Sequence, residues 1–204
     1  FNKIFSLINQ TRYFIYEVIL LKFIRLKKKN IYLKKDPLIE IILPTYNRSE
    51  MLKTRSIPSV LKQTYKNFRL IIIGDCCTDD SENIVKQFND DRIFFYNLSE
   101  RKKRYPETVE NHWFAGPVVG INTALKIVKG DWIARIDDDD IWEEEHLEKL
   151  LNHAIKENVE FVSSSYTVIL NGTKILKDFS RDHPAIGGVQ TWLYISYLKF
   201  FKSN

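Results

Sequence analysis

Four consecutive aspartates, Asp137 to Asp140, directly follow the apolar run Trp132 to Ile136. Carboxylates crowded at a strand end repel one another, at a cost of roughly 1 kcal/mol per contact at ~4 Å in water and ~4 kcal/mol at a protein-surface dielectric. A divalent cation that is also held by phosphate oxygens would relieve this repulsion. The alternative is a solvated acidic turn. Because the run lies between a buried strand and a helix, we favour the metal site.

Further polar residues follow two other apolar runs. Positions 45 to 47 come after the β-branched run 39–43, which Pro44 is expected to end, and Asp75 comes after the run 69–73. Parallel sheets bind ligands at the carboxyl ends of their strands. We therefore expect these residues and the aspartates to converge on one edge of a sheet.

Strands and helices alternate along the chain, which indicates an α/β domain with a mostly parallel sheet flanked by helices. Pro58 should kink the first helix of this domain or shift its start. Asn171-Gly172 indicates a hairpin turn. The predicted strands cover 39–43, 69–73, 92–96 and 132–136, the predicted helices cover 49–63, 80–89, 117–128 and 143–157, and the predicted hairpin joins 161–170 to 173–176.

The first 35 residues form a basic arm that is distinct from the rest of the chain. They carry nine Lys or Arg and one acid, Glu17, so their net charge is +8 and the remaining residues sum to −3. Apolar residues at helical spacing predict one amphipathic helix over 1–29. Charges at Glu17, Lys22 and Arg25 interrupt it too often for a membrane span. Contact with a membrane surface and packing on another protein segment both fit this pattern; nucleic acid is not expected as a partner, because no nucleic-acid-binding fold is indicated.

The composition narrows the possible functions. The chain has 204 residues, 44% hydrophobic and 28% charged, which is typical of a soluble globular protein. It contains no G-x-G-x-x-G and no G-x-x-x-x-G-K-[ST], which argues against a glycine-cradled nucleotide site. The two cysteines, Cys76 and Cys77, are adjacent, so a disulfide scaffold and a zinc site are both unexpected. A reducing, cytoplasmic compartment is the simplest expectation, with membrane association on the cytoplasmic face through the basic arm.

Three segments together carry a family resemblance. They are IEIILPTYNR at 39–48, SVLKQTYKNFRLIIIGDCCTDDS at 59–81 and KGDWIARIDDDDIW at 129–142. In this order and spacing they resemble family 2 glycosyltransferases of the GT-A fold, over about residues 39 to 170. The resemblance implies transfer of a sugar from a nucleotide-diphosphate donor, most simply a UDP-sugar, with inversion at the anomeric carbon; dTDP and GDP donors stay open. The implied domains are the arm, 1–35, and a nucleotide-sugar-binding domain, 36–204.

The resemblance also implies roles for individual residues. Pro44, Thr45 and Tyr46 match the turn that wraps the base in this family, and Asp75 matches the carboxylate that reads the pyrimidine edge. Asp138 would hold the ribose hydroxyls. The D-x-D signature matches Asp137-Asp138-Asp139, so Asp137 and Asp139 are the metal candidates, for Mn²⁺ or Mg²⁺. Such an ion would stabilise the charge that develops on the leaving diphosphate.

The chain also departs from the family pattern. Cys76 and Cys77 replace the usual small residues after Asp75, and the segment 115–122 carries valines where polar residues are expected. The general base that deprotonates an acceptor hydroxyl lies, in the family, in an acidic segment after an aromatic stretch like 191–200. We therefore expect the base beyond residue 204 and the domain to be incomplete at its C-terminus. The acceptor would be a saccharide, a lipid-linked group or a protein; the alternative function is a noncatalytic donor-binding or membrane-associated fragment.

Overall fold

The computed structural model describes residues 11, 14–27, 29–100, 116–178 and 187–200. The chain divides into two compact units, Phe1–Asp36 and Pro37–Asn204. In the first unit, a π-helix at Ile15–Leu20 leads into helix α2, Leu21–Lys27, and a 3-10 helix follows at Lys29–Leu33. The helix predicted over 1–29 is thus helical at 15–27 but not one regular α-helix, and its first ten residues lie outside the described part.

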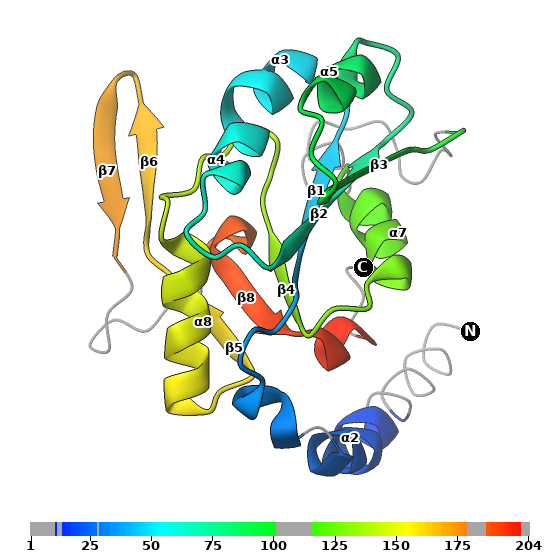
Figure 1. The fold of residues 1–204 in the computed structure, drawn as a ribbon, viewed down its shortest axis with the longest axis vertical. Helices are drawn as coiled ribbons and strands as arrows, with labels where there is room; N and C mark the ends of the chain where they lie inside the picture. Colours follow the sequence, from blue (N-terminus) through cyan, green and yellow to red (C-terminus); the bar gives the residue numbers. More distant parts are fainter. Residues whose placement is uncertain (1–10, 12–13, 28, 101–115, 179–186, 201–204) are drawn as a thin grey trace. The chain divides into compact units, whose positions relative to one another are not determined.

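The second unit is built on one six-stranded sheet with the order β3-β2-β1-β4-β8-β5 (Figure 1). Strands β1 to β4 run parallel, and β8 pairs antiparallel with both of its neighbours. This confirms the α/β fold with a mostly parallel sheet. The strands are β1 (Ile39–Thr45), β2 (Phe68–Gly74), β3 (Ile93–Asn97), β4 (Trp132–Arg135), β5 (Phe161–Ser163) and β8 (Trp192–Ile195).

Pro44 does not end the first strand, contrary to the prediction, because β1 continues to Thr45. The reason lies in the direction of its backbone nitrogen. The carbonyls of Ile42 and Thr45 accept from Ile136 and Asp75 respectively, so position 44 faces the side of β4. Pairing with β4 stops at Ile42, so the N–H that proline lacks has no strand to donate to.

Helices cover both faces of this sheet. Helix α7 (Val118–Ile127) lies on one side, and α4 (Ile57–Leu61) and α8 (His146–Glu157) lie on the other (Figure 1). The α7 side forms a core of buried aliphatic residues from β1, β2, β4 and α7. The predicted helix at 143–157 begins three residues later, at His146, and that at 80–89 is observed as α5 (Ser81–Gln87).

The helix after β1 is irregular, as the presence of Pro58 within it predicts. It starts as α3 (Ser49–Met51), continues as a π-helix at Leu52–Ser56 and ends as α4. A proline ring clashes with the carbonyl four residues before it and donates no hydrogen bond, so the preceding turn widens.

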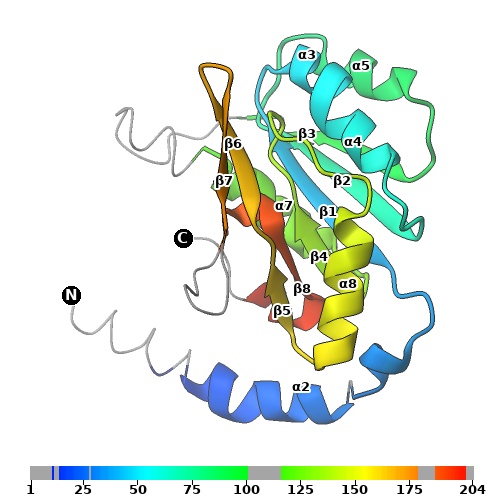
Figure 2. The same cartoon turned by 90° about the vertical axis from the view of Figure 1, so that its left-hand side faces the viewer.

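The predicted hairpin is present, but it is separate from the large sheet. Strand β6 (Tyr166–Leu170) pairs with β7 (Thr173–Lys177) around Asn171 and Gly172, which both have positive φ (Figure 2). The single strand predicted over 161–170 is wrong, since it is divided into β5 and β6. Within the described residues, no helix is both long and apolar enough to cross a membrane.

Candidate functional site

A pocket of about 310 Å³ lies at the carboxyl ends of the parallel strands. All seven residues predicted to bind a nucleotide or a metal line it. The lining comes from the ends of β1 and β2, the start of α7 and the turn after β4: Pro44, Thr45, Tyr46, Arg48, Ile73, Asp75, Gly116, Pro117, Gly120, Asp137, Asp138 and Asp139. The predicted convergence of three separate segments on one sheet edge is therefore what the fold produces.

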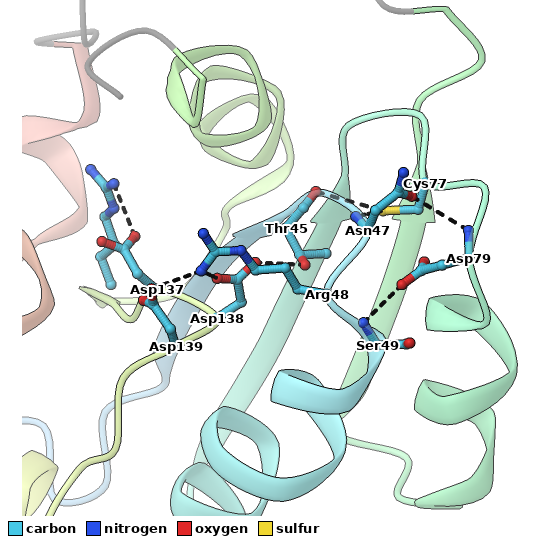
Figure 3. A network of polar contacts seen from close by, with 10 residues as sticks. Thr45, Asn47, Arg48, Ser49, Cys77, Asp79, Asp137, Asp138 and Asp139 are labelled. Carbon is cyan, nitrogen blue, oxygen red and sulfur yellow. Dashed lines mark hydrogen bonds and ion pairs between the residues drawn. The ribbon is translucent and has the colours of Figure 1, made fainter. Parts of the chain in front are cut away.

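The turn after β1 is fixed by Asn47, which adopts a left-handed backbone conformation with φ of 51°. Its side-chain Oδ1 accepts a hydrogen bond from the Thr78 backbone N–H at 2.8 Å. Two residues later, the Ser49 N–H donates to Asp79 Oδ2 at 2.8 Å. These contacts tie the turn after β1 to the turn after β2, and Figure 3 shows the one between Ser49 and Asp79. Tyr46 and Arg48, on either side of Asn47, are thereby held at the pocket.

The turn after β2 is equally constrained. The Asp75 backbone N–H donates to the Thr45 carbonyl at 2.8 Å, and the Asp75 side chain is buried in the pocket wall. Asn97 holds the next part of the turn, since its Oδ1 accepts from the Cys77 N–H at 2.8 Å and its Nδ2 donates to the Cys77 carbonyl at 2.9 Å. A Cβ on Gly74 would come within 2.6 Å of Asn97 Oδ1, so a larger residue there would push the Asn97 side chain away from Cys77.

The two cysteines have a structural role in this turn. Cys76 has a positive φ of 60°, and neither cysteine forms a disulfide. The Cys77 sulfur accepts a hydrogen bond from the Asn47 backbone N–H at 3.4 Å. Burial raises the pKa of the Cys77 thiol, which favours the neutral thiol over a reactive thiolate.

The aspartate run forms a tight turn in which the Asp140 N–H donates to the Asp137 carbonyl at 3.2 Å. Asp138 is the buried member, only 7% exposed, and its Oδ2 accepts a hydrogen bond of 2.8 Å from Thr45 Oγ1. Burial raises the pKa of Asp138, while the Thr45 hydroxyl opposes that rise. Burial also raises the pKa of Asp140 to about 6, helped by the charges of Asp137 and Asp139.

Arginines of the chain itself neutralise much of this negative charge. Arg48 Nη1 lies 2.7 Å from Asp139 Oδ2 and 3.2 Å from Asp138 Oδ1 (Figure 3). Arg135 Nη2 lies 3.0 Å from Asp137 Oδ1. The repulsion that suggested a bound cation is thus partly compensated without one. Sequence reasoning missed Arg48, although its place directly after the Pro-Thr-Tyr-Asn turn could have marked it.

The acidic turn offers the right atoms for Mg²⁺ or Mn²⁺, since both prefer carboxylate and phosphate oxygens. Asp137 and Asp139 have side chains that are 35% and 46% exposed, so both are accessible. Among the described residues, no three His, Cys, Asp or Glu side chains are grouped to hold a metal ion.

Helix α7 begins at the pocket, and its packing there is close. Gly120 lies against β1, because a Cβ at this position would come within 3.2 Å of the Pro44 Cβ. On the other side of the aspartates, Trp142 stacks on His146 with ring centroids 4.6 Å apart, and its Nε1 donates to the Gln190 carbonyl at 2.7 Å. This connects the segment after the aspartates to the start of β8.

Comparisons with known proteins agree with this architecture. The model of glycosyl transferase family 2 matches residues 40–200. The β-1,3-glucosyltransferase WfgD of Escherichia coli, which is named for a UDP-Glc donor and an α-D-GlcNAc-diphosphoundecaprenol acceptor, is 34% identical over 142 residues, covering 70% of this chain and 51% of WfgD. The chain spans about half the length of such curated relatives.

Solved structures share the fold. TarS 1–349 of S. aureus in complex with UDP matches with a TM-score of 0.63 and 22% identity, over 78% of this chain and 47% of that one. The mannosyltransferase PcManGT of Pyrobaculum calidifontis, in complex with GDP-Man and Mn²⁺, matches with a TM-score of 0.51 and 20% identity, over 71% and 42%. With its mostly parallel sheet and a family match that covers most of its length, this chain belongs to the family 2 glycosyltransferases of the GT-A fold.

Proposed function

We propose that this chain carries the donor-binding domain of an inverting glycosyltransferase, which transfers a sugar from a UDP-sugar to an acceptor hydroxyl with the help of a divalent metal ion. The acceptor would be a saccharide, a lipid-linked group or a protein, in polysaccharide biosynthesis. The names of similar proteins support this proposal, since WfgD is named for a UDP-Glc donor and a lipid-diphosphate acceptor and TarS was solved with UDP.

The observation that carries the proposal is the convergence of Tyr46, Asp75 and Asp138 in one pocket. A tyrosine ring is a face on which a base can stack. Asp75 is acceptor-only when ionised, which suits the N–H of a uracil ring. Asp138 is buried and held by Thr45, so its carboxylate has a fixed position from which it could accept hydrogen bonds from ribose hydroxyls. Pro44 and Thr45 complete the wall beside the base.

Asp137 and Asp139 are the residues that would hold Mn²⁺ or Mg²⁺, because both are accessible at the pocket. When bound, the ion would supply positive charge to the diphosphate as it leaves. The residues of the chain would bind and orient the donor. Transfer also needs a carboxylate that takes the proton of the acceptor hydroxyl, and we place that general base outside the described residues.

Isothermal titration calorimetry with UDP, dTDP and GDP, each with and without Mn²⁺, tests this assignment. We expect UDP to bind most tightly and Mn²⁺ to increase its affinity. Asp139→Ala should remove the effect of Mn²⁺. Asp178→Ala is the matched control, because that carboxylate accepts a hydrogen bond from Ser165 and lies outside the pocket lining. Absent binding of all three nucleotides, or UDP binding that is indifferent to Mn²⁺, would contradict the proposal.

We also propose that residues 1–29 contact an anionic membrane surface, on the cytoplasmic face. Ile15, Ile19, Phe23 and Leu26 are exposed and share one helix face at spacings of four, four and three residues. Lys22, Arg25 and Lys27 lie on the same helical stretch, and such helices bind in the interface of anionic lipids.

Co-sedimentation of the chain with vesicles of phosphatidylcholine alone, and with added phosphatidylglycerol, tests this contact. Binding should need the anionic lipid, weaken as salt rises and fall in Phe23→Ser. Phe94→Ser, which removes an exposed aromatic residue from β3, is the control and should leave binding unchanged. Equal binding to neutral and anionic vesicles would argue against the proposal.

A further inference from the structure

Arg48 contacts two carboxylates of the pocket at once. One nitrogen, Nη1, contacts the carboxylates of both Asp138 and Asp139, at 3.2 and 2.7 Å. The backbone beneath this side chain is fixed, because the Arg48 carbonyl accepts from the Leu52 N–H at 3.1 Å and the turn before it is held by Asn47. The side chain itself is 44% exposed. The Arg48 guanidinium can therefore change partners while the Arg48 backbone stays in place.

The two carboxylates that Arg48 bridges are not equivalent. Asp138 is buried and is also held by the Thr45 hydroxyl, so a loss of charge compensation there would leave a buried anion. Asp139 is half exposed, and its hydrogen-bond partner within the described part of the chain is Arg48. The contact with Asp139 is the one that can be given up, because water or another cation can replace the guanidinium there.

We propose that Arg48 is an exchangeable counter-ion of the donor pocket. In the free protein it neutralises Asp139. When a nucleoside diphosphate binds together with a divalent cation, Arg48 releases Asp139, keeps its contact with Asp138 and turns its free N–H groups toward the diphosphate oxygens. This inference rests on the proposed function, since it assumes that the pocket takes a nucleoside diphosphate and a metal ion.

The chemistry of the guanidinium supports this exchange. It carries five N–H donors in a planar fork, which suits carboxylate and phosphate oxygens equally well. A guanidinium and a divalent cation on the same carboxylate would repel each other strongly in a partly buried pocket. A diphosphate supplies the alternative anion that makes the release of Asp139 favourable.

The exchange makes metal and nucleotide binding interdependent. Without a nucleotide, a metal ion meets a carboxylate that Arg48 already neutralises, so it should bind weakly. With UDP present, Arg48 has another anion to bind and Asp139 becomes available. By thermodynamic linkage, UDP and the metal ion must then raise each other's affinity by the same factor.

The test measures the binding of Mn²⁺ alone, by the electron paramagnetic resonance signal of free Mn²⁺, in the wild type and in Arg48→Gln. The variant should bind Mn²⁺ alone about tenfold more tightly, and the factor by which UDP and Mn²⁺ raise each other's affinity should fall about tenfold. Arg92→Gln is the matched control, because Arg92 also pairs with an aspartate, Asp90, but lies outside the pocket lining. It should change neither quantity.

Unchanged Mn²⁺ affinity in folded Arg48→Gln would overturn the inference. The effect must act through Asp139, so Arg48→Gln should not raise the Mn²⁺ affinity when Asp139→Asn is already present. A double variant that binds Mn²⁺ more tightly than Asp139→Asn alone would also overturn the inference. If circular dichroism shows that Arg48→Gln does not fold, Arg48→Lys replaces it. Lysine keeps the positive charge but lacks the planar fork of N–H donors, so the coupling between UDP and Mn²⁺ binding should fall. Unchanged coupling in this variant overturns the inference. The Mn²⁺-alone measurement needs no nucleotide, so failure of the wild type to bind UDP counts against the proposed function and leaves the Arg48 test standing.

Discussion

Asp138 shows how a single carboxylate can be prepared for binding. It is buried at the carboxyl end of β4, where burial alone favours its protonated form. The Thr45 hydroxyl and the Arg48 guanidinium both favour the ionised form. Because these two partners come from the turn after β1, the charge of Asp138 depends on contacts across 90 or more positions in the sequence.

Thr45→Val tests the first of these contacts. Valine has nearly the same shape but no hydroxyl, so the Asp138 carboxylate loses a buried hydrogen bond. We expect the free energy of unfolding, measured with urea at pH 7.5, to fall by roughly 1.5–3 kcal/mol, as is typical for hydrogen bonds to charged groups.

Thr54→Val is the matched control for this substitution. The Thr54 hydroxyl donates to the Glu50 carbonyl on an exposed stretch of helix, where water can replace it. Its loss should change stability by about 0.5 kcal/mol or less. Equal effects of the two substitutions would show that Asp138 does not need the Thr45 hydroxyl.

At the level of elements, the pocket is made by two turns that are fastened to each other. The turn after β1 and the turn after β2 share hydrogen bonds through Asn47 and Cys77, and each turn contains a residue with positive φ. Helix α7 packs closely enough that a Cβ on Gly120 would come within 3.2 Å of the Pro44 Cβ. Loops carry most residues of the pocket lining, but the sheet fixes where those loops start.

Asn47 contributes a hydrogen-bond acceptor and a left-handed backbone conformation to its turn, and two substitutions separate these contributions. Asn47→Gly removes the acceptor for the Thr78 N–H but tolerates the left-handed backbone, whereas Asn47→Ala also strains it. We expect urea unfolding to show a loss of roughly 0.5–1.5 kcal/mol for the glycine variant. The alanine variant should lose about 1 kcal/mol more.

UDP affinity measured on the same Asn47 variants should follow the same order, since Tyr46 and Arg48 depend on this turn. An alanine variant as stable as the glycine variant would contradict the role given to the backbone conformation.

At the scale of the whole molecule, charge is divided between the basic arm and the rest of the chain. Residues 1–35 have a net charge of +8 and the remainder −3. The excess positive charge therefore belongs to the arm, whereas the aspartates of the pocket are balanced locally by Arg48 and Arg135. His146 is a buried histidine of the second unit. Its ring stacks on Trp142, and its Nε2 has no hydrogen-bond partner in the described part of the chain. The stability of this unit should therefore depend on the protonation of His146.

This histidine predicts acid sensitivity. Burial lowers the pKa of His146 to about 4, from 6.5 in the unfolded chain. As the pH falls, the unfolded state takes up a proton on this histidine before the folded state does. The contribution of neutral His146 to stability is therefore fully present above pH 6.5 and is lost as the pH falls from 6.5 to 4. At pH 5 the loss from this group is roughly 2 kcal/mol.

His146→Phe keeps an aromatic ring but cannot take up the proton. The difference in unfolding free energy between pH 8 and pH 5 should therefore be smaller in the variant than in the wild type. His153→Phe, at an exposed position of the same helix, is the control for the histidine-to-phenylalanine substitution itself. Parallel pH curves for the wild type and His146→Phe would rule out this cause.

The sequence alone determined the α/β class, the parallel strands, the hairpin turn and the convergence of Thr45, Asp75 and the aspartates on one edge of the sheet. These follow from local rules: alternating strands and helices place the carboxyl ends of the parallel strands on the same edge, so Thr45, Asp75 and the aspartates meet there. Asn171-Gly172 fixes its turn by backbone conformation alone.

Only the tertiary structure decided how the charges and the far edge of the sheet are arranged. Strand β8 is four residues long and joins β4 to β5 antiparallel, and nothing local distinguishes it from other short apolar runs. The pairing of Arg48 with Asp138 and Asp139 is likewise invisible in the sequence, because the energy of an ion pair depends on distance and burial, and both are set by the packing of the whole sheet. The four aspartates suggested a cation from their spacing alone; the fold shows that the chain supplies two cations of its own, Arg48 and Arg135.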